Sequence, residues 1–119
     1  MSGITDAMEL ARAGKSKLAS DMLRNEFDRL NTPERMVELC EWLAVCFEGL
    51  EDYEQAASWY ETAGQYILSE PRARYPVQEM ESLREYEKAL ECYEQIDDIE
   101  GIQRCGAMMA DLRRSCASS

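Results

Sequence analysis

The chain of 119 residues contains no histidine, and this absence removes several kinds of site at once. Histidine is the usual general base and the most common metal ligand, so Ser-His and Cys-His catalytic pairs are excluded. The six glycines are scattered singly, and the sequence has no glycine-rich loop that could hold a phosphate. We therefore expect a protein that is not an enzyme and has no catalytic residues, metal site or cofactor.

Long apolar runs are also missing. The longest stretch without a charged residue is 62–69, far short of the roughly 20 apolar residues that span a membrane. Segment 1–6 lacks the basic start and the apolar core of a signal peptide. We expect a soluble protein.

Basic residues are few, because 13 Lys and Arg stand against 24 Asp and Glu and the net charge is −11. Such acidity argues against nucleic acid or an anionic membrane surface as the partner. A basic partner remains open, and so does the simpler interpretation that the charge keeps the protein soluble.

The five cysteines are odd in number and form no Cys-x-x-Cys motif: Cys40, Cys46, Cys92, Cys105 and Cys116. This usage fits a reducing compartment, so we expect a cytoplasmic protein. We interpret most of them as small buried apolar side chains and expect Cys116, in the tail, to react. A thiol redox function would need a cysteine with a lowered pKa, and nothing basic flanks Cys40 or Cys46.

What the chain does contain is an internal repeat. Segment 53–61 (YEQAASWYE) returns 33 residues later as 86–94 (YEKALECYE), with Tyr, Glu, Ala, Tyr and Glu at the same five places. A fixed period in the thirties is typical of stacked helix pairs, in which one pair cannot bury its apolar face alone. The repeat predicts an all-α protein built as a short helical solenoid.

Turn and cap signals divide the chain into roughly six helical stretches within a single domain, 1–119. The expected helix pairs cover about 4–30, 33–68 and 76–114, with a proline-broken segment at 70–76 and a frayed tail at 115–119. Because 77–96 contains neither Gly nor Pro, one unbroken helix is the alternative to two there. Three pairs have the spacing of a capping box: Asp52 with Gln55, Ser82 with Glu85, and Asp97 with Glu100.

The repeated segments resemble the tetratricopeptide repeat family, whose units of about 34 residues are antiparallel helix pairs. The family's large, small and aromatic positions are matched best by Leu43, Ala44 and Phe47 on one helix and Tyr53, Ala56, Tyr60 and Ala63 on the next. Tyr86, Ala89 and Tyr93 match in the last unit, where Pro76 departs from the pattern. The resemblance implies a short right-handed solenoid of about three helix pairs.

Within that family, the first helices of successive units line a groove that holds a segment of a partner protein. The resemblance assigns to this groove Glu38, Glu41, Val45 and Glu48 in the best unit, and Arg74, Gln78 and Glu81 in the last. Spacings of three, four and three place the first four on one helix face, and that face is acidic. We therefore predict an adaptor or chaperone-like module that binds a basic or amphipathic segment, with a merely solvated face as the alternative.

A second hypothesis is self-assembly. Short helical arrays must cover their apolar ends, and Trp42, Trp59 and Tyr66 would then drive formation of a homodimer.

Overall fold

The computed structural model describes residues 9–10, 13–14, 16–29, 33–70 and 77–118. Its elements are five helices: α2 (Ser16–Arg29), α3 (Pro33–Gly49), α4 (Tyr53–Ser69), α5 (Gln78–Gln95) and α6 (Ile99–Ser118). The all-α prediction is confirmed for this part of the chain. Most of the expected first helix, 4–13, and most of the proline-broken segment, 70–76, lie outside the described residues.

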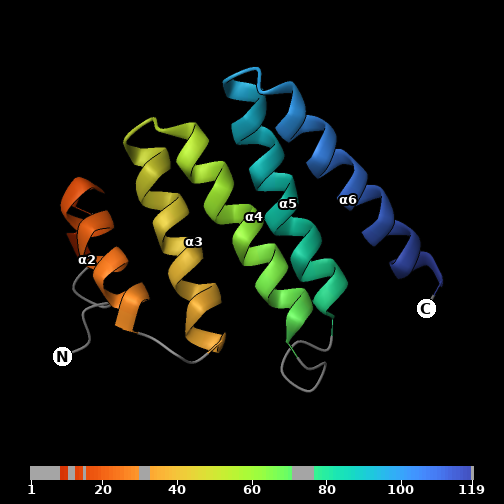
Figure 1. Cartoon of the computed structure of the whole chain (residues 1–119), viewed down its shortest axis with the longest axis horizontal. Helices are drawn as coiled ribbons and strands as arrows, with labels where there is room; N and C mark the ends of the chain where they lie inside the picture. The colour runs from red at the N-terminus through yellow and green to blue at the C-terminus, as the bar shows by residue number, and fades with distance from the viewer. Residues whose placement is uncertain (1–8, 11–12, 15, 30–32, 71–76, 119) are drawn as a thin grey trace.

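The helices lie side by side in chain order, and each runs antiparallel to the one before it (Figure 1). The packed pairs are α2 with α3, α3 with α4, α4 with α5, and α5 with α6. As a result, α3 and α5 run in the same direction on either side of α4. No helix in the described ranges is apolar over a length sufficient to cross a bilayer.

Small and medium apolar side chains form the core between the helices. Each helix contributes at least one fully buried residue: Leu23, Leu43, Ala57, Ala89 and Cys105, in chain order. Alanine and cysteine at such positions let helix axes approach closely, and the aromatic rings fill the space beside them.

Two tyrosines of α5 lie directly against glycines of the neighbouring helices. A Cβ atom at Gly64 of α4 would lie 2.8 Å from Tyr86 Cε2, and one at Gly101 of α6 would lie 2.5 Å from Tyr93 Cδ1. Real Cβ atoms do not approach other atoms so closely. Glycine at these two positions therefore allows α5 to pack between α4 and α6.

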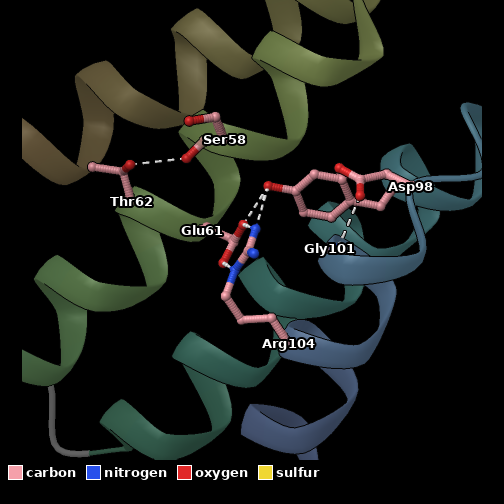
Figure 2. A network of polar contacts seen from close by, with 7 residues as sticks. Ser58, Glu61, Thr62, Asp98, Gly101 and Arg104 are labelled. Atoms are coloured by element: carbon pink, nitrogen blue, oxygen red, sulfur yellow. Dashed lines mark hydrogen bonds and ion pairs between the residues drawn. The ribbon is translucent and has the colours of Figure 1, made fainter.

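A polar network joins α4, α5 and α6, the last three helices of the array. Arg104 donates from Nε to Glu61 Oε2 at 2.9 Å and from Nη2 to Glu61 Oε1 at 2.8 Å, as Figure 2 shows. The hydroxyl of Tyr93 also donates to Glu61 Oε1. Glu61 is buried, but because donors reach both of its oxygens the cost of burying the charge is offset.

The helix ends confirm one predicted cap and correct two. Gln55 N donates to Asp52 Oδ1 at 3.2 Å at the start of α4, as expected. At the start of α6, however, the cap is Asp98, which accepts from Gly101 N at 3.2 Å (Figure 2). Asp97 instead takes a left-handed backbone conformation, with φ of 52°. The predicted capping box of Asp97 and Glu100 is therefore wrong, and the observed cap lies one residue later in the chain.

The predicted capping box of Ser82 and Glu85 is also wrong. Residues 78–95 form one unbroken helix, which settles the alternative left open by the sequence, and Val77 caps it without a side-chain hydrogen bond. Ser82 is buried inside the helix, where its hydroxyl donates to the carbonyl oxygen of Gly64 at 2.9 Å. At the other end of the chain, α6 continues to Ser118 through residues expected to fray.

The structural repeat is longer than the sequence repeat. The turn after α3 and the turn after α5 both contain one left-handed residue, Glu51 or Asp97, followed by a capping aspartate. In each turn the aspartate N–H donates to the fifth residue back, from Asp52 to Phe47 O at 2.9 Å and from Asp98 to Tyr93 O at 3.0 Å. The α3–α4 and α5–α6 hairpins are therefore equivalent at a step of 46 residues, from Asp52 to Asp98.

The repeat of 33 residues has a different origin. Segment 53–61 forms the first half of α4, whereas 86–94 forms the second half of α5. The two segments thus belong to neighbouring antiparallel helices and lie beside each other (Figure 1). The sequence repeat predicted that they occupy equivalent helices of successive pairs, and this prediction is wrong.

The tyrosine contact on α6 can be tested by substitution. We expect Gly101→Ala to destabilise the protein by about 1–3 kcal/mol, because the added methyl group would overlap the ring of Tyr93 and force α6 away from α5. Chemical denaturation followed by circular dichroism measures the change in unfolding free energy.

Gly106, on the same helix, provides a matched control because a Cβ there meets nothing within 4 Å. Gly106→Ala should leave stability unchanged or raise it by about 0.5–1 kcal/mol through helix propensity. Equal effects of the two substitutions would show that the close approach of α5 and α6 is not maintained in solution.

Candidate binding groove

A groove runs between α3 and α5 over α4. Two hollows lie in it, of about 240 Å³ and about 380 Å³, and Lys88 lines both. The other residues lining the first hollow are Val37, Glu41, Ile67, Glu81, Arg84 and Glu85. Those lining the second are Glu48, Tyr53, Tyr60, Glu91, Cys92 and Gln95. Each hollow is thus built from three successive helices.

Three residues predicted from the sequence lie in these hollows. Glu41 of α3 and Glu81 of α5 face the first hollow across the groove, and Glu48 lines the second. Their positions follow from helical spacing, because each lies three or four residues from another predicted residue on the same face. The structure therefore brings together acidic residues from helices that are far apart in the sequence.

The remaining predicted residues are placed differently. Glu38 is exposed beside Glu41, whose pKa its charge helps to raise. Val45 is 46% exposed and lines neither hollow. Gln78 donates from Nε2 to the carbonyl oxygen of Leu68 at 3.2 Å, which ties the start of α5 to the end of α4. Arg74 lies outside the described residues.

The second hollow is organised around a buried tyrosine. The hydroxyl of Tyr60 donates to Glu48, and the ammonium group of Lys88 lies 5.6 Å from the centre of the Tyr60 ring. Burial, and then the hydrogen bond with Glu48, raise the pKa of Tyr60, so the phenol stays protonated. Glu48 is thus a partner of Tyr60 as well as part of the groove wall.

Glu85 is the one acidic residue lining the first hollow that is not among the residues predicted from the sequence. Its side chain is only 5% exposed, and burial, followed by the charge of Glu41, raises its pKa to about 7. The sequence carried a signal for it, since Gln78, Glu81, Glu85 and Lys88 follow the same spacing of three, four and three. The spacing of Ser82 and Glu85 competes with that signal, because it also fits a capping box at a helix start.

Glu41 and Glu85 act as a coupled acid pair across the groove. Burial raises the pKa of Glu41, the charge of Lys88 lowers it, and the charges of Glu38 and Glu81 raise it. The charge of Glu41 in turn helps to raise the pKa of Glu85, because two carboxylates close together resist both being ionised. With a pKa of about 7, Glu85 is therefore partly protonated at neutral pH and mostly protonated below it.

Other acceptor atoms at this end of the groove lack donors. Buried oxygen atoms of three α5 side chains have no hydrogen-bond partner among the described residues: Gln78 Oε1, Glu81 Oε2 and Glu85 Oε2. A buried acceptor without a donor costs about 1–3 kcal/mol, so most native structures avoid it. The first hollow therefore contains unmet hydrogen-bonding capacity.

The four buried cysteines show no sign of activation. Burial raises the pKa of Cys40 and Cys105 to about 12 and that of Cys92 to about 11. These thiols stay protonated and unreactive at neutral pH, which removes support for a redox function based on them. Within the described ranges, no cluster of three or more acidic or cysteine side chains is arranged to hold a metal ion.

No protein-family model matches the chain, and no curated protein or solved structure is significantly similar to it. The resemblance to tetratricopeptide repeats therefore stays a prediction. The function has to be inferred from the geometry and the charges of the groove.

The raised pKa of Glu85 predicts how stability depends on pH. The folded protein holds a proton on Glu85 that the unfolded chain releases near pH 4.5, so this contribution to stability is present below that pH and is lost as the pH rises through about 7. We expect Glu85→Gln to stabilise the protein at about pH 8 by on the order of 2 kcal/mol, and to change little near pH 4.

Denaturant titrations of the parent and the variant at several pH values measure this difference. Glu54→Gln removes the same charge from an exposed position of α4 and should give a small difference that varies little with pH. A constant difference between Glu85→Gln and the parent from acidic to alkaline pH would contradict the assignment of the proton to Glu85.

Proposed function

We propose that this protein is a non-enzymatic interaction module, an adaptor or chaperone-like scaffold that holds a basic or amphipathic segment of another protein in the groove between α3 and α5. The observation that carries the proposal is the pair of hollows lined by both helices and by α4. They follow one another along the groove, since Lys88 borders both, and so suit a segment laid along it rather than a single compact ligand.

The proposal includes a right-handed solenoid related to tetratricopeptide repeats. Contacts restricted mainly to helices adjacent in the chain and the equivalence of the α3–α4 and α5–α6 hairpins support this architecture. The chain departs from the family in its period, because α3 begins at Pro33 and α5 at Gln78, well beyond the family's spacing of about 34 residues. The step consists of α3 and α4, at 17 residues each, the turn between them, and the segment between α4 and α5.

The charge of the groove indicates the kind of segment. Five glutamates line the two hollows, against the cations Arg84 and Lys88. A cationic segment would be attracted to this surface, and attraction between exposed charges raises the association rate and weakens as salt is added. Apolar residues at the groove, Val37 and Ile67, would pack against the aliphatic parts of such a segment.

Self-assembly has less support. Trp42 and Trp59, which the sequence suggested as exposed contacts, pack against the core and are only partly exposed. The exposed apolar side chains include Leu18, Val45, Val77, Met80 and Ile99, and they lie on or next to four different helices. We therefore treat a homodimer as an outcome of the binding experiment.

Selection from a display library of random peptides against the immobilised protein tests the proposal. We expect enrichment of peptides rich in Arg and Lys that bind in fluorescence anisotropy and lose affinity as salt is raised. Glu38→Lys with Glu91→Lys should weaken them about tenfold or more, because Glu91 lines the second hollow, Glu38 lies beside Glu41, both are exposed, and the change removes the negative charge that attracts a cationic segment.

The control combines Glu94→Lys with Glu100→Lys, which change the net charge equally at exposed positions outside both hollows. Equal loss of binding in the two double variants would mean that peptides respond only to net charge. Failure to select any peptide, together with a dimer in analytical ultracentrifugation, would favour self-assembly.

A further inference from the structure

The first hollow combines apolar side chains with closely spaced carboxyl groups, and a general attraction for cationic segments does not account for this combination. It is lined both by the apolar side chains of Val37 and Ile67 and by the carboxyl groups of Glu41, Glu81 and Glu85. Its volume of about 240 Å³ exceeds the roughly 30 Å³ that one water molecule occupies in the liquid, so it can admit a side chain.

Glu85 is the decisive residue because it is 5% exposed, lines the hollow and leaves Oε2 without a donor among the described residues. Glu81 Oε2, one helical turn earlier on the same face of α5, lacks a donor too. These two unmet acceptors are one helical turn apart and line the same hollow as Glu41. Together they suit a ligand that has several N–H groups and a positive charge.

The protein's own cations do not supply these donors. Arg84 and Lys88 line the hollow but are exposed, and neither donates to the unmet oxygens of Glu81 or Glu85. Lys88 lies instead over the ring of Tyr60. The two cations therefore act as a charged rim.

From this arrangement we infer that the first hollow is a socket for the guanidinium group of one arginine in the partner segment, held by Glu41, Glu81 and Glu85. The inference rests on the proposed function, to which it adds the anchoring residue of the partner. It also assigns Glu85 a direct role in binding.

Arginine fits better than other cations for two reasons. Its planar group carries five N–H donors in a fixed fork, which can serve carboxylate oxygens on both sides, whereas lysine offers a single compact ammonium group. Its aliphatic stem would lie against Val37 and Ile67, a contact that a hydrated metal ion would not use.

Binding of the arginine would be linked to release of a proton. The titratable or charged groups around Glu85 are Cys40 and Glu41 on α3, Tyr60 on α4, and Glu81, Arg84 and Lys88 on α5. The pKa values of Cys40 and Tyr60 are raised far above neutrality, so only the coupled acid pair exchanges its proton near neutral pH. A guanidinium group favours the ionised pair, and affinity should rise with pH.

The experiment is a titration with N-acetyl-arginine methylamide, followed by methyl signals in two-dimensional ¹H–¹³C NMR spectra. We expect the signals of Val37 and Ile67 to shift and saturate while that of Val45, outside both hollows, stays in place. Because about a tenth of Glu85 is ionised one pH unit below its pKa of about 7 and nine-tenths one unit above, affinity should be about tenfold higher near pH 8 than near pH 6.

Matched ligands and variants complete the test. The neutral isostere N-acetyl-citrulline methylamide should leave Val37 and Ile67 unshifted, and the lysine analogue should bind more weakly than arginine. Glu85→Gln should lose both the affinity and its pH dependence, whereas Glu54→Gln, exposed on α4, should behave as the parent. Equal shifts with arginine and citrulline, equal binding by Glu85→Gln, or displacement of arginine by calcium chloride but not by sodium chloride would overturn the socket.

Failure of the socket can be told apart from failure of the proposed function. If selected peptides bind the groove and replacing each of their arginines by citrulline changes nothing, the groove stands and the socket is wrong. If no peptide binds but the arginine probe shifts Val37 and Ile67, the hollow binds guanidinium groups and the peptide-binding function is wrong.

Discussion

The close packing of α5 against its two neighbours is the constraint on which the rest of the structure depends. Tyr86 lies on the backbone of α4 at Gly64, and Tyr93 lies on the backbone of α6 at Gly101. Each ring takes the space that a Cβ atom would need, so the distances between these helices are set by contact with backbone and leave little freedom. Because Glu85 directly precedes Tyr86, the contact that fixes α5 also fixes the depth at which this carboxyl group lies in the groove.

Much of the helical framework could be predicted from the sequence, but its period could not. Spacing of apolar residues and the cap at Asp52 indicated where helices lie, since both depend on neighbours within one or two turns. The recurring Tyr and Ala residues at 53–61 and 86–94 were misleading, because any two helices that pack closely need small residues beside large rings. The true equivalence lies in the turns around Asp52 and Asp98 and depends on backbone conformation, which leaves a weaker trace in the sequence.

The candidate groove was predictable in part, because helical spacing decides which residues share a face. Glu41 and Glu81 could be assigned to helix faces by counting, and both line the first hollow. Glu85 follows the same spacing, but the spacing of Ser82 and Glu85 also fits a helix start, so counting alone does not decide between a helix start and a helix interior. What distinguishes the two is the bond from Ser82 to the carbonyl oxygen of Gly64, a contact between different helices. Spacing within one helix does not predict the role of a residue that depends on a contact between different helices.

The two buried glutamates on the central helices show how a structural carboxylate differs from one available to a ligand. Glu61 has donors on both oxygens, from Tyr93 and Arg104, so the contact between the helices leaves neither oxygen unpaired. Glu85 is equally buried but retains an oxygen without a donor, and burial together with the charge of a second acid, Glu41, raises its pKa. Stability alone would favour an apolar or amide side chain there, because a buried unpaired carboxyl group destabilises the fold. A cationic partner reverses that balance, since it supplies the missing donors and makes the ionised pair favourable, so the position costs stability in the free protein and contributes affinity in the complex.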